Sequence, residues 1–261
     1  MLASLAGAAY YYAAQLRFFR SLLGHSKVPT IVGEAIDGLD KGCSIVLTCV
    51  STDESSVARQ VKKKGDDEED TDNLVEEEDS ERVRSRIERG MLLDTFEATL
   101  EYAESMITDT EVHSKLAALK TRARSMDLPK ISVIDTVTRH LARHLGGCDS
   151  VAELTGRRYQ LRVDSFDDDA NDINSWKITS KTADVTSERA RFQSGGARVC
   201  VLSAACSTGV SLHHDSDKTG RRKMISMELP YSGTSMAQAL GRCHRSNQRS
   251  AGPRGRHTRR T

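Results

Sequence analysis

The sequence is poor in aromatic residues and cysteines, and it has no long apolar run. Aromatic residues make up 5% of the 261 positions, and the six cysteines lie far apart without a CxxC pair. This spacing excludes a zinc ribbon and a disulfide-stapled secreted module, and it fits reduced thiols in the cytosol or nucleus. No stretch reaches the roughly 18 apolar residues of a spanning helix. We expect no secretory signal either, because the apolar start lacks a basic n-region and is interrupted by tyrosines.

Two nucleotide-binding motifs are also missing. The sequence has no GxxxxGK[ST] phosphate loop, and no DExH or DExD box adjoins a buried run. These motifs cradle the phosphates of ATP and hold Mg²⁺. We therefore expect the chain to be inactive as an ATPase by itself.

No metal site is expected. The acidic run at residues 167–172 is interpreted as solvated, and His140 and His144 have only Cys148 as a nearby third ligand. A tetrahedral metal site would need a fourth ligand at a sensible spacing, so these histidines are interpreted as ordinary helix residues.

The near-neutral net charge of +1 conceals two segments of opposite charge. Eleven of the 16 residues from Asp66 to Glu81 are acidic, whereas Arg242 to Thr261 contains seven arginines and no acid. The acidic composition cannot bury enough apolar area to offset ordering, which predicts a disordered insertion over residues 61–82. Residues 249–261 are predicted to be a basic disordered tail, so that one domain spans residues 1–248.

The apolar pattern predicts an α/β fold. Helical spacing is found in residues 10–23 and 28–39, in residues 83–124, in residues 134–147 and in a polar segment ending at Gly195 and Gly196. Buried β-rich runs occupy residues 43–50 and 198–204, a third strand is expected at residues 223–229, and residues 153–165 indicate a turn and a strand. A last helix begins near Ser232 or Thr234. This order predicts a parallel sheet with helical insertions, whose ligands gather at the carboxyl ends of the strands.

Two segments in the C-terminal third are candidates for a phosphate site. Residues 201–214, VLSAACSTGVSLHH, run from a buried strand into small and hydroxyl residues. Such residues let backbone amides and hydroxyls approach phosphate oxygens. Residues 238–248 contain Gln-x-x-Gly-Arg-x-x-Arg, which places two guanidinium groups on one helical face. One strand separates the two segments in the sequence, so both are expected at the carboxyl-end edge of the sheet. We therefore predict that they form one phosphate-binding site at this edge.

The two segments also carry a family resemblance. LSAACSTGVSLHHD and RRKMISMELPYSGTSMAQALGRCHRSNQ resemble motifs V and VI of the strawberry notch family, which is similar to superfamily 2 helicases, in its C-terminal RecA-like domain. Residues 15–59 resemble the start of that domain, and LARHLGGCDSVAELTGRRYQL resembles its middle. The resemblance extends over most of residues 15–248, apart from the acidic tract.

The resemblance implies a role for each matching residue. Arg242 and Arg245 would be arginine fingers, and the nucleotide would contact Gln238, Gly241, Ser203, Thr208 and Gly209. The nucleic-acid backbone would contact Ser51, Thr52, Ser207 and Ser211. ATP and Mg²⁺ would bind only together with an N-terminal RecA-like domain, which is missing from this sequence, and the chain alone would hold neither tightly.

The resemblance further implies a nuclear protein that acts in transcription or chromatin regulation. Its partners would be nucleic acid, with DNA favoured, an N-terminal RecA-like domain in cis or trans, and transcription or chromatin proteins, but no membrane. Two alternatives stay open: a non-catalytic module that binds nucleic acid or protein, and a truncated gene product without independent activity. A cytoplasmic location is the alternative to the nucleus.

Overall fold

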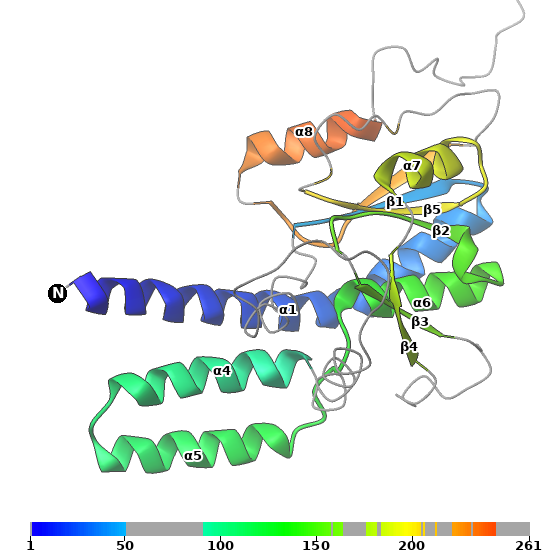
Figure 1. Ribbon diagram of the computed structural model, residues 1–261. Coiled ribbons are helices and arrows are strands. Elements are labelled where there is room, and N and C mark those ends of the chain that lie inside the picture. The colour runs from blue at the N-terminus through cyan, green and yellow to red at the C-terminus, as the bar shows by residue number, and fades with distance from the viewer. Residues whose placement is uncertain are drawn as a thin grey trace, which may run out of the picture.

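The structure, a computed structural model, describes residues 2–50, 91–157, 159–163, 176–181, 184–204, 206, 212, 221–230 and 232–243. Its helices and strands, shown in Figure 1, are α1 (Leu2–Asp40), β1 (Ser44–Cys49), α4 (Met91–Met106), α5 (Thr110–Arg124), α6 (Val133–Leu145), the 3₁₀ turn η2 (Cys148–Ser150), β2 (Val151–Leu154), β3 (Tyr159–Val163), β4 (Trp176–Ser180), α7 (Val185–Gln193), β5 (Val199–Ser203), β6 (Arg222–Ser226) and α8 (Gly233–Cys243). The predicted acidic insertion and basic tail lie outside these residues.

A four-stranded parallel sheet forms the centre of the fold. Its order is β2-β5-β1-β6, and β3 and β4 form a separate antiparallel pair. The α/β class and the parallel sheet are confirmed, and α4, α5 and α6 are helical insertions between the first strand and β5. Within the described part of the chain, no helix is both long and apolar enough to cross a bilayer.

Each face of the sheet is buried under helices. Ile45 and Leu47 of β1 pack with Ala35 of α1 and Leu141 of α6, whereas Val46 packs on the other face with Phe192 of α7. This alternation follows from the two-residue period of a strand. Figure 1 shows α1 and α6 on one side of the sheet and α7 and α8 on the other.

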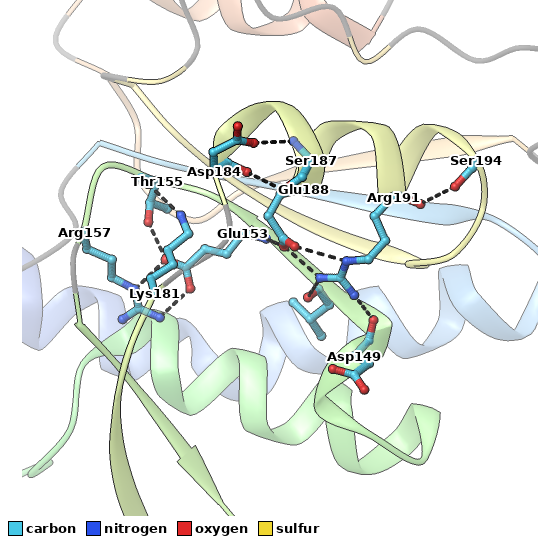
Figure 2. Close-up of polar contacts among 11 residues, drawn as sticks. Asp149, Glu153, Thr155, Arg157, Lys181, Asp184, Ser187, Glu188, Arg191 and Ser194 are labelled. Atoms are coloured by element: carbon cyan, nitrogen blue, oxygen red, sulfur yellow. Dashed lines mark hydrogen bonds and ion pairs between the residues drawn. The ribbon is translucent and has the colours of Figure 1, made fainter. Parts of the chain in front are cut away.

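The outer edge of β2 is bonded by side chains of α7. The Glu188 carboxylate accepts the Glu153 backbone N–H at 2.8 Å, and the Arg191 guanidinium donates to the carbonyls of Val151, at 2.8 Å, and Asp149. Figure 2 shows both side chains reaching from the helix to the strand. An unpaired strand edge is a template for further pairing, and these bonds satisfy its backbone groups instead.

The two helices predicted over residues 10–23 and 28–39 are one continuous helix, α1, which runs through Pro29. The predicted gap at residues 24–27 is therefore wrong, and the helix also passes Pro29, which removes one backbone donor. The helix continues because tertiary contacts hold both sides of the proline: Val28 and Ile31 are buried, and His25 Nε2 lies 2.8 Å from the Ile131 carbonyl oxygen.

The amino-terminal half of α1 belongs to a helical arm. Phe18 of α1 packs on Phe96 of α4 with ring centroids 5.2 Å apart, and α5 returns alongside α4. Ion pairs Lys120–Glu104 at 2.6 Å and Arg124–Glu97 at 2.5 Å join α4 to α5. The predicted helical character of residues 91–124 is confirmed, with a break at residues 107–109.

Candidate nucleotide and nucleic-acid site

The candidate site is built on the edge where the parallel strands end. Cys49 of β1 lies opposite Ser203 of β5, and Thr48 of β1 lies opposite Ser226 of β6. The chain therefore leaves three neighbouring strands at one rim. Loops at the carboxyl ends of such strands are where α/β proteins bind ligands.

Backbone hydrogen bonds at this edge continue the pairing by one residue beyond the ends of β5 and β6. The Ala204 N–H donates to the Cys49 carbonyl at 2.9 Å, and the Met227 N–H donates to the Thr48 carbonyl at 2.9 Å. The chain segments that leave the strands thus begin from fixed positions.

Glu228 connects the exits of β1 and β6. Its carboxylate accepts the Val50 backbone N–H at 3.2 Å, and its carbonyl accepts the Ser226 hydroxyl at 2.6 Å. The sequence pattern predicts no role for this residue. The only signal available was an acid at the end of an apolar run, MISMEL.

Ser203 is the last residue of β5 and is buried. Its hydroxyl oxygen accepts the Cys206 backbone N–H at 3.3 Å. In this conformation the hydroxyl bonds to the backbone three residues beyond the strand. The candidate residues Ser207, Thr208, Gly209 and Ser211 lie outside the described residues, as do Ser51 and Thr52 after β1.

Helix α8 follows β6 and carries the Gln-x-x-Gly-Arg motif. Ser232 caps it, since its hydroxyl oxygen accepts the Ser235 N–H at 3.1 Å, which confirms one of the two predicted caps. Gln238 and Gly241 are exposed on this helix. A Cβ atom at Gly241 would meet nothing within 4 Å, so no packing inside the chain requires glycine there.

The two arginines of the motif are only partly covered by the structure. Arg242 lies in the last turn of α8, but its side chain is outside the described set, and Arg245 is outside it entirely. The structure therefore brings Gln238, Gly241 and the backbone of Arg242 together on one helix, which follows the same rim as Ser203.

A buried ion cluster that the sequence pattern did not predict lies at the end of β2. Arg157 is 5% exposed, and it donates to the two carboxylate oxygens of Glu153 at 2.5 and 2.7 Å. The same guanidinium lies 2.8 Å from Asp135 of α6. The Thr155 hydroxyl also donates to Glu153, and Lys181 donates to the Thr155 carbonyl at 2.7 Å (Figure 2).

The charges of the cluster stabilise each other. Burial by itself would raise the pKa of Glu153, but the hydrogen bonds and charge of Arg157 outweigh burial and hold that pKa below its usual value. Burial would likewise lower the pKa of Arg157, but the carboxylates of Asp135 and Glu153 raise it. Asp135, Glu153 and Arg157 are all buried, so we interpret the cluster as a structural contact that holds the end of β2 against α6. An acid inside a short apolar strand, followed four residues later by arginine, is the signal that could have found it.

No group of three or more His, Cys, Asp or Glu side chains that could hold a metal ion occurs in the described ranges. His144 lies 3.2 Å from Asp40 of α1. This contact gives His144 a structural partner.

Comparison with known proteins adds to this geometry. Residues 136–254 match the family described as the C-terminal domain on strawberry notch homologues. The chain is 40% identical over 113 residues to protein strawberry notch of Drosophila melanogaster, which covers 41% of this chain and 7% of that protein. It is 30% identical over 207 residues to strawberry notch homolog 1 of Rattus norvegicus, which covers 77% of this chain and 15% of that protein.

A plant protein is also similar: FORGETTER 1 of Arabidopsis thaliana is 37% identical over 136 residues, which cover 49% of this chain and 10% of that protein. The chain therefore spans only a small part of each of these relatives. No solved structure matches the chain.

Proposed function

Because the chain carries the C-terminal helicase-like domain of the strawberry notch family, we propose that it forms one side of a composite site for ATP and nucleic acid. The observation that supports this proposal is the shared rim. The segment with Ser203 and the helix with Gln238, Gly241 and Arg242 both follow strands that end at this edge of the sheet. A two-sided site needs such groups on rigid elements that face a second domain.

The proposed roles divide the motif residues between two ligands. Arg242 and Arg245 are arginine fingers that stabilise the negative charge on the transferred phosphoryl group. The nucleotide contacts come from the small and amide residues Gln238, Gly241, Ser203, Thr208 and Gly209. The nucleic-acid backbone contacts come from the hydroxyl residues Ser51, Thr52, Ser207 and Ser211.

The residues of this rim are better suited to contact the phosphates of ATP than to bind the Mg²⁺ ion that accompanies them. Gln238 and Gly241 are accessible on α8, and glycine at 241 permits close approach of a ligand. For Mg²⁺, the described residues offer no acidic cluster, and the sequence has no DExH box. In the proposal an N-terminal RecA-like domain, in cis or in trans, therefore holds Mg²⁺ and most of ATP.

The cellular setting is proposed from the family. The domain acts in the nucleus, on DNA, together with transcription or chromatin proteins. The seven arginines without an acid from Arg242 to Thr261 support binding to a polyanion, because each phosphate contact releases condensed counterions.

The test joins the chain to the N-terminal RecA-like domain of a strawberry notch relative and measures ATP hydrolysis with and without DNA. The joined protein is expected to hydrolyse ATP faster with DNA, whereas the chain alone is inactive. Gln238→Ala should lower the rate, and Gln160→Ala on β3 is the matched control for an amide removed elsewhere. A joined protein that is folded and binds DNA but hydrolyses no ATP would support the non-catalytic module instead.

A further inference from the structure

Arg222, the first residue of β6, bonds to the backbone at the far end of the segment that follows Ser203. Its guanidinium donates to the Leu212 carbonyl and to the side-chain oxygen of Gln193, the latter at 2.8 Å. The guanidinium carbon lies 4.5 Å from the ring centroid of Phe192. Leu212 is fully buried and packs with Phe192 on the face of the sheet that α7 covers (Figure 1). One arginine therefore joins Leu212 to the end of α7.

The other end of this segment is held at the rim. Ser203 ends β5, and its hydroxyl oxygen accepts the Cys206 N–H at 3.3 Å. Leu212 lies near the amino ends of the strands, because Arg222 begins β6 and α7 ends shortly before the chain enters β5. Between these two fixed points the sequence places four candidate contact residues for nucleotide and nucleic acid: Ser207, Thr208, Gly209 and Ser211.

The distance between the fixed points is large for the length of the segment. Ser203 pairs with Cys49 and Arg222 pairs with Ser44, which lies five positions earlier on β1. Five strand positions and two strand spacings separate the Cα atoms of Ser203 and Arg222 by about 19 Å. Nine residue steps lead from Ser203 to Leu212, and fully extended they reach about 30 Å. A fixed Leu212 therefore restricts the conformations that the residues near the rim can adopt.

We propose that Arg222 is a positioning residue for the site of the proposed function. By holding the Leu212 carbonyl against α7, it orders the segment that starts at Ser203 and so prepares its hydroxyls and amides for phosphate oxygens. A segment that is ordered before binding loses less conformational entropy when the ligand binds. The inference rests on the proposed function, which assigns the phosphate contacts to this segment, and Arg222 itself contacts neither ligand.

Arg198 offers a matched control. It directly precedes β5, and its guanidinium donates to the carbonyls of Leu39, at 2.7 Å, and Cys43, at 3.2 Å. Like Arg222, it therefore bonds a distant backbone carbonyl to the sheet. Neither of its two acceptors lies in a segment with a candidate contact residue. A variant of Arg198 thus measures the loss of such bonds without a change at the rim.

The first measurement is hydrogen exchange of the full chain, followed on the peptide of residues 204–212. Arg222→Met removes the donors to Leu212 and Gln193 and should speed exchange of this peptide by about tenfold or more. Arg222→Lys keeps a single donor group without the planar fork and should give an intermediate rate. Arg198→Met should leave this peptide unchanged. Exchange in Arg222→Met equal to that of the parent would overturn the proposal.

The second measurement is ATP hydrolysis by the joined protein with DNA, together with the melting temperature of each variant. Arg222→Met should raise both the KM for ATP and the DNA concentration for half-maximal stimulation by about fivefold or more, and change kcat by less than about twofold. Binding then has to order the segment, whereas saturating ligands restore that order. Arg198→Met should keep the parent values of both constants, even where its melting temperature falls.

The outcomes separate this inference from the function on which it rests. A parent joined protein that hydrolyses no ATP would refute the proposed function, and the role of Arg222 with it. An active parent whose Arg222→Met variant keeps both constants would overturn the positioning role alone. If Arg222→Met does not fold, Arg222→Lys decides, since exchange and constants equal to those of the parent would show that the two-donor guanidinium is not required.

Discussion

Glu188 and Arg191, three residues apart on α7, form an ion pair at 2.7 Å, and both side chains hydrogen-bond to the backbone of β2 along its outer edge. The carboxylate accepts the backbone N–H of Glu153, and the guanidinium donates to the Val151 carbonyl. The pair thus replaces the neighbouring strand that would otherwise satisfy these groups. A strand of four residues at the edge of a sheet is stabilised without offering its backbone to another chain.

Removing this edge contact should destabilise the fold. Arg191→Ala leaves the Val151 carbonyl without the guanidinium donor and removes the cation beside the Glu188 carboxylate, which should lower the free energy of unfolding by about 1–3 kcal/mol. Urea unfolding measures the change. Arg189→Ala is the matched control, because Arg189 is exposed on the same helix, and its effect should stay within about 0.5 kcal/mol. Equal effects of the two substitutions would mean that the edge bonds contribute nothing specific.

The buried cluster at Arg157 should be more sensitive. Arg157→Met removes the cation and leaves Glu153 and Asp135 buried as unpaired acids, which should cost about 3–5 kcal/mol at neutral pH. Arg122→Met, at an exposed arginine of α5, should have little effect. If Arg157→Met is combined with Glu153→Gln and Asp135→Asn, much of the stability should return, because no unpaired charge remains. A triple variant as unstable as the single one would contradict this explanation.

The same cluster predicts a pH dependence. The pKa of Glu153 in the folded chain lies below its ordinary value of 4.5, so its contribution to stability is complete above pH 4.5 and is lost as the pH falls through the folded value. In Arg157→Met the carboxylate has no cation, and protonation relieves its burial. Burial without the cation raises the pKa of Glu153 above 4.5 in Arg157→Met, so this variant regains stability as the pH falls towards 4.5, whereas the parent loses stability only below it. The difference in stability between the two proteins should therefore narrow as the pH falls from neutral through 4.5. Urea unfolding between neutral pH and about pH 4 measures it, and a constant difference would mean that Glu153 is not ionised beside Arg157.

The sequence predicts the elements whose pattern is local. The strands β1, β5 and β6 and the polar helix α7 are predicted because the apolar residues, glycines and capping residues that mark them lie within each segment. β2 was missed, since its four residues include Glu153. Its strand conformation depends on β5 and on side chains of α7 that follow it by more than 30 residues.

In the candidate site, too, local features could be predicted from the sequence and contacts between distant residues could not. The position of α8 after a strand end could be predicted from the motif and its cap. The role of Glu228 could not, because its carboxylate contacts the backbone of Val50, 178 residues earlier in the chain. The continuity of α1 through Pro29 was likewise determined by contacts with distant residues such as Ile131.

Glu228 should hold the exit of β1 in place. Glu228→Ala removes the acceptor of the Val50 N–H, and we expect a loss of about 1–2 kcal/mol together with faster hydrogen exchange at Val50. Glu228→Gln keeps an acceptor oxygen and should change both quantities less. Glu101→Ala, at an exposed acid of α4, is the control. Unchanged exchange at Val50 in Glu228→Ala would show that the carboxylate does not restrain this segment.

The last prediction concerns Arg242 and Arg245 in the protein joined to an N-terminal RecA-like domain. An arginine finger stabilises charge that develops in the transition state, and in related nucleotide hydrolases it changes the rate by roughly 10³ to 10⁵. Lysine keeps the positive charge but loses the planar guanidinium, so Arg242→Lys and Arg245→Lys should lower kcat strongly and change KM little.

Arg221→Lys, at an exposed arginine before β6, is the matched control and should retain the parent rate. Steady-state ATP hydrolysis and the melting temperature are measured for each variant. If both lysine variants are stable and hydrolyse ATP near the parent rate, the two arginines do not act on the phosphoryl group, and a binding role without turnover becomes the better description of α8.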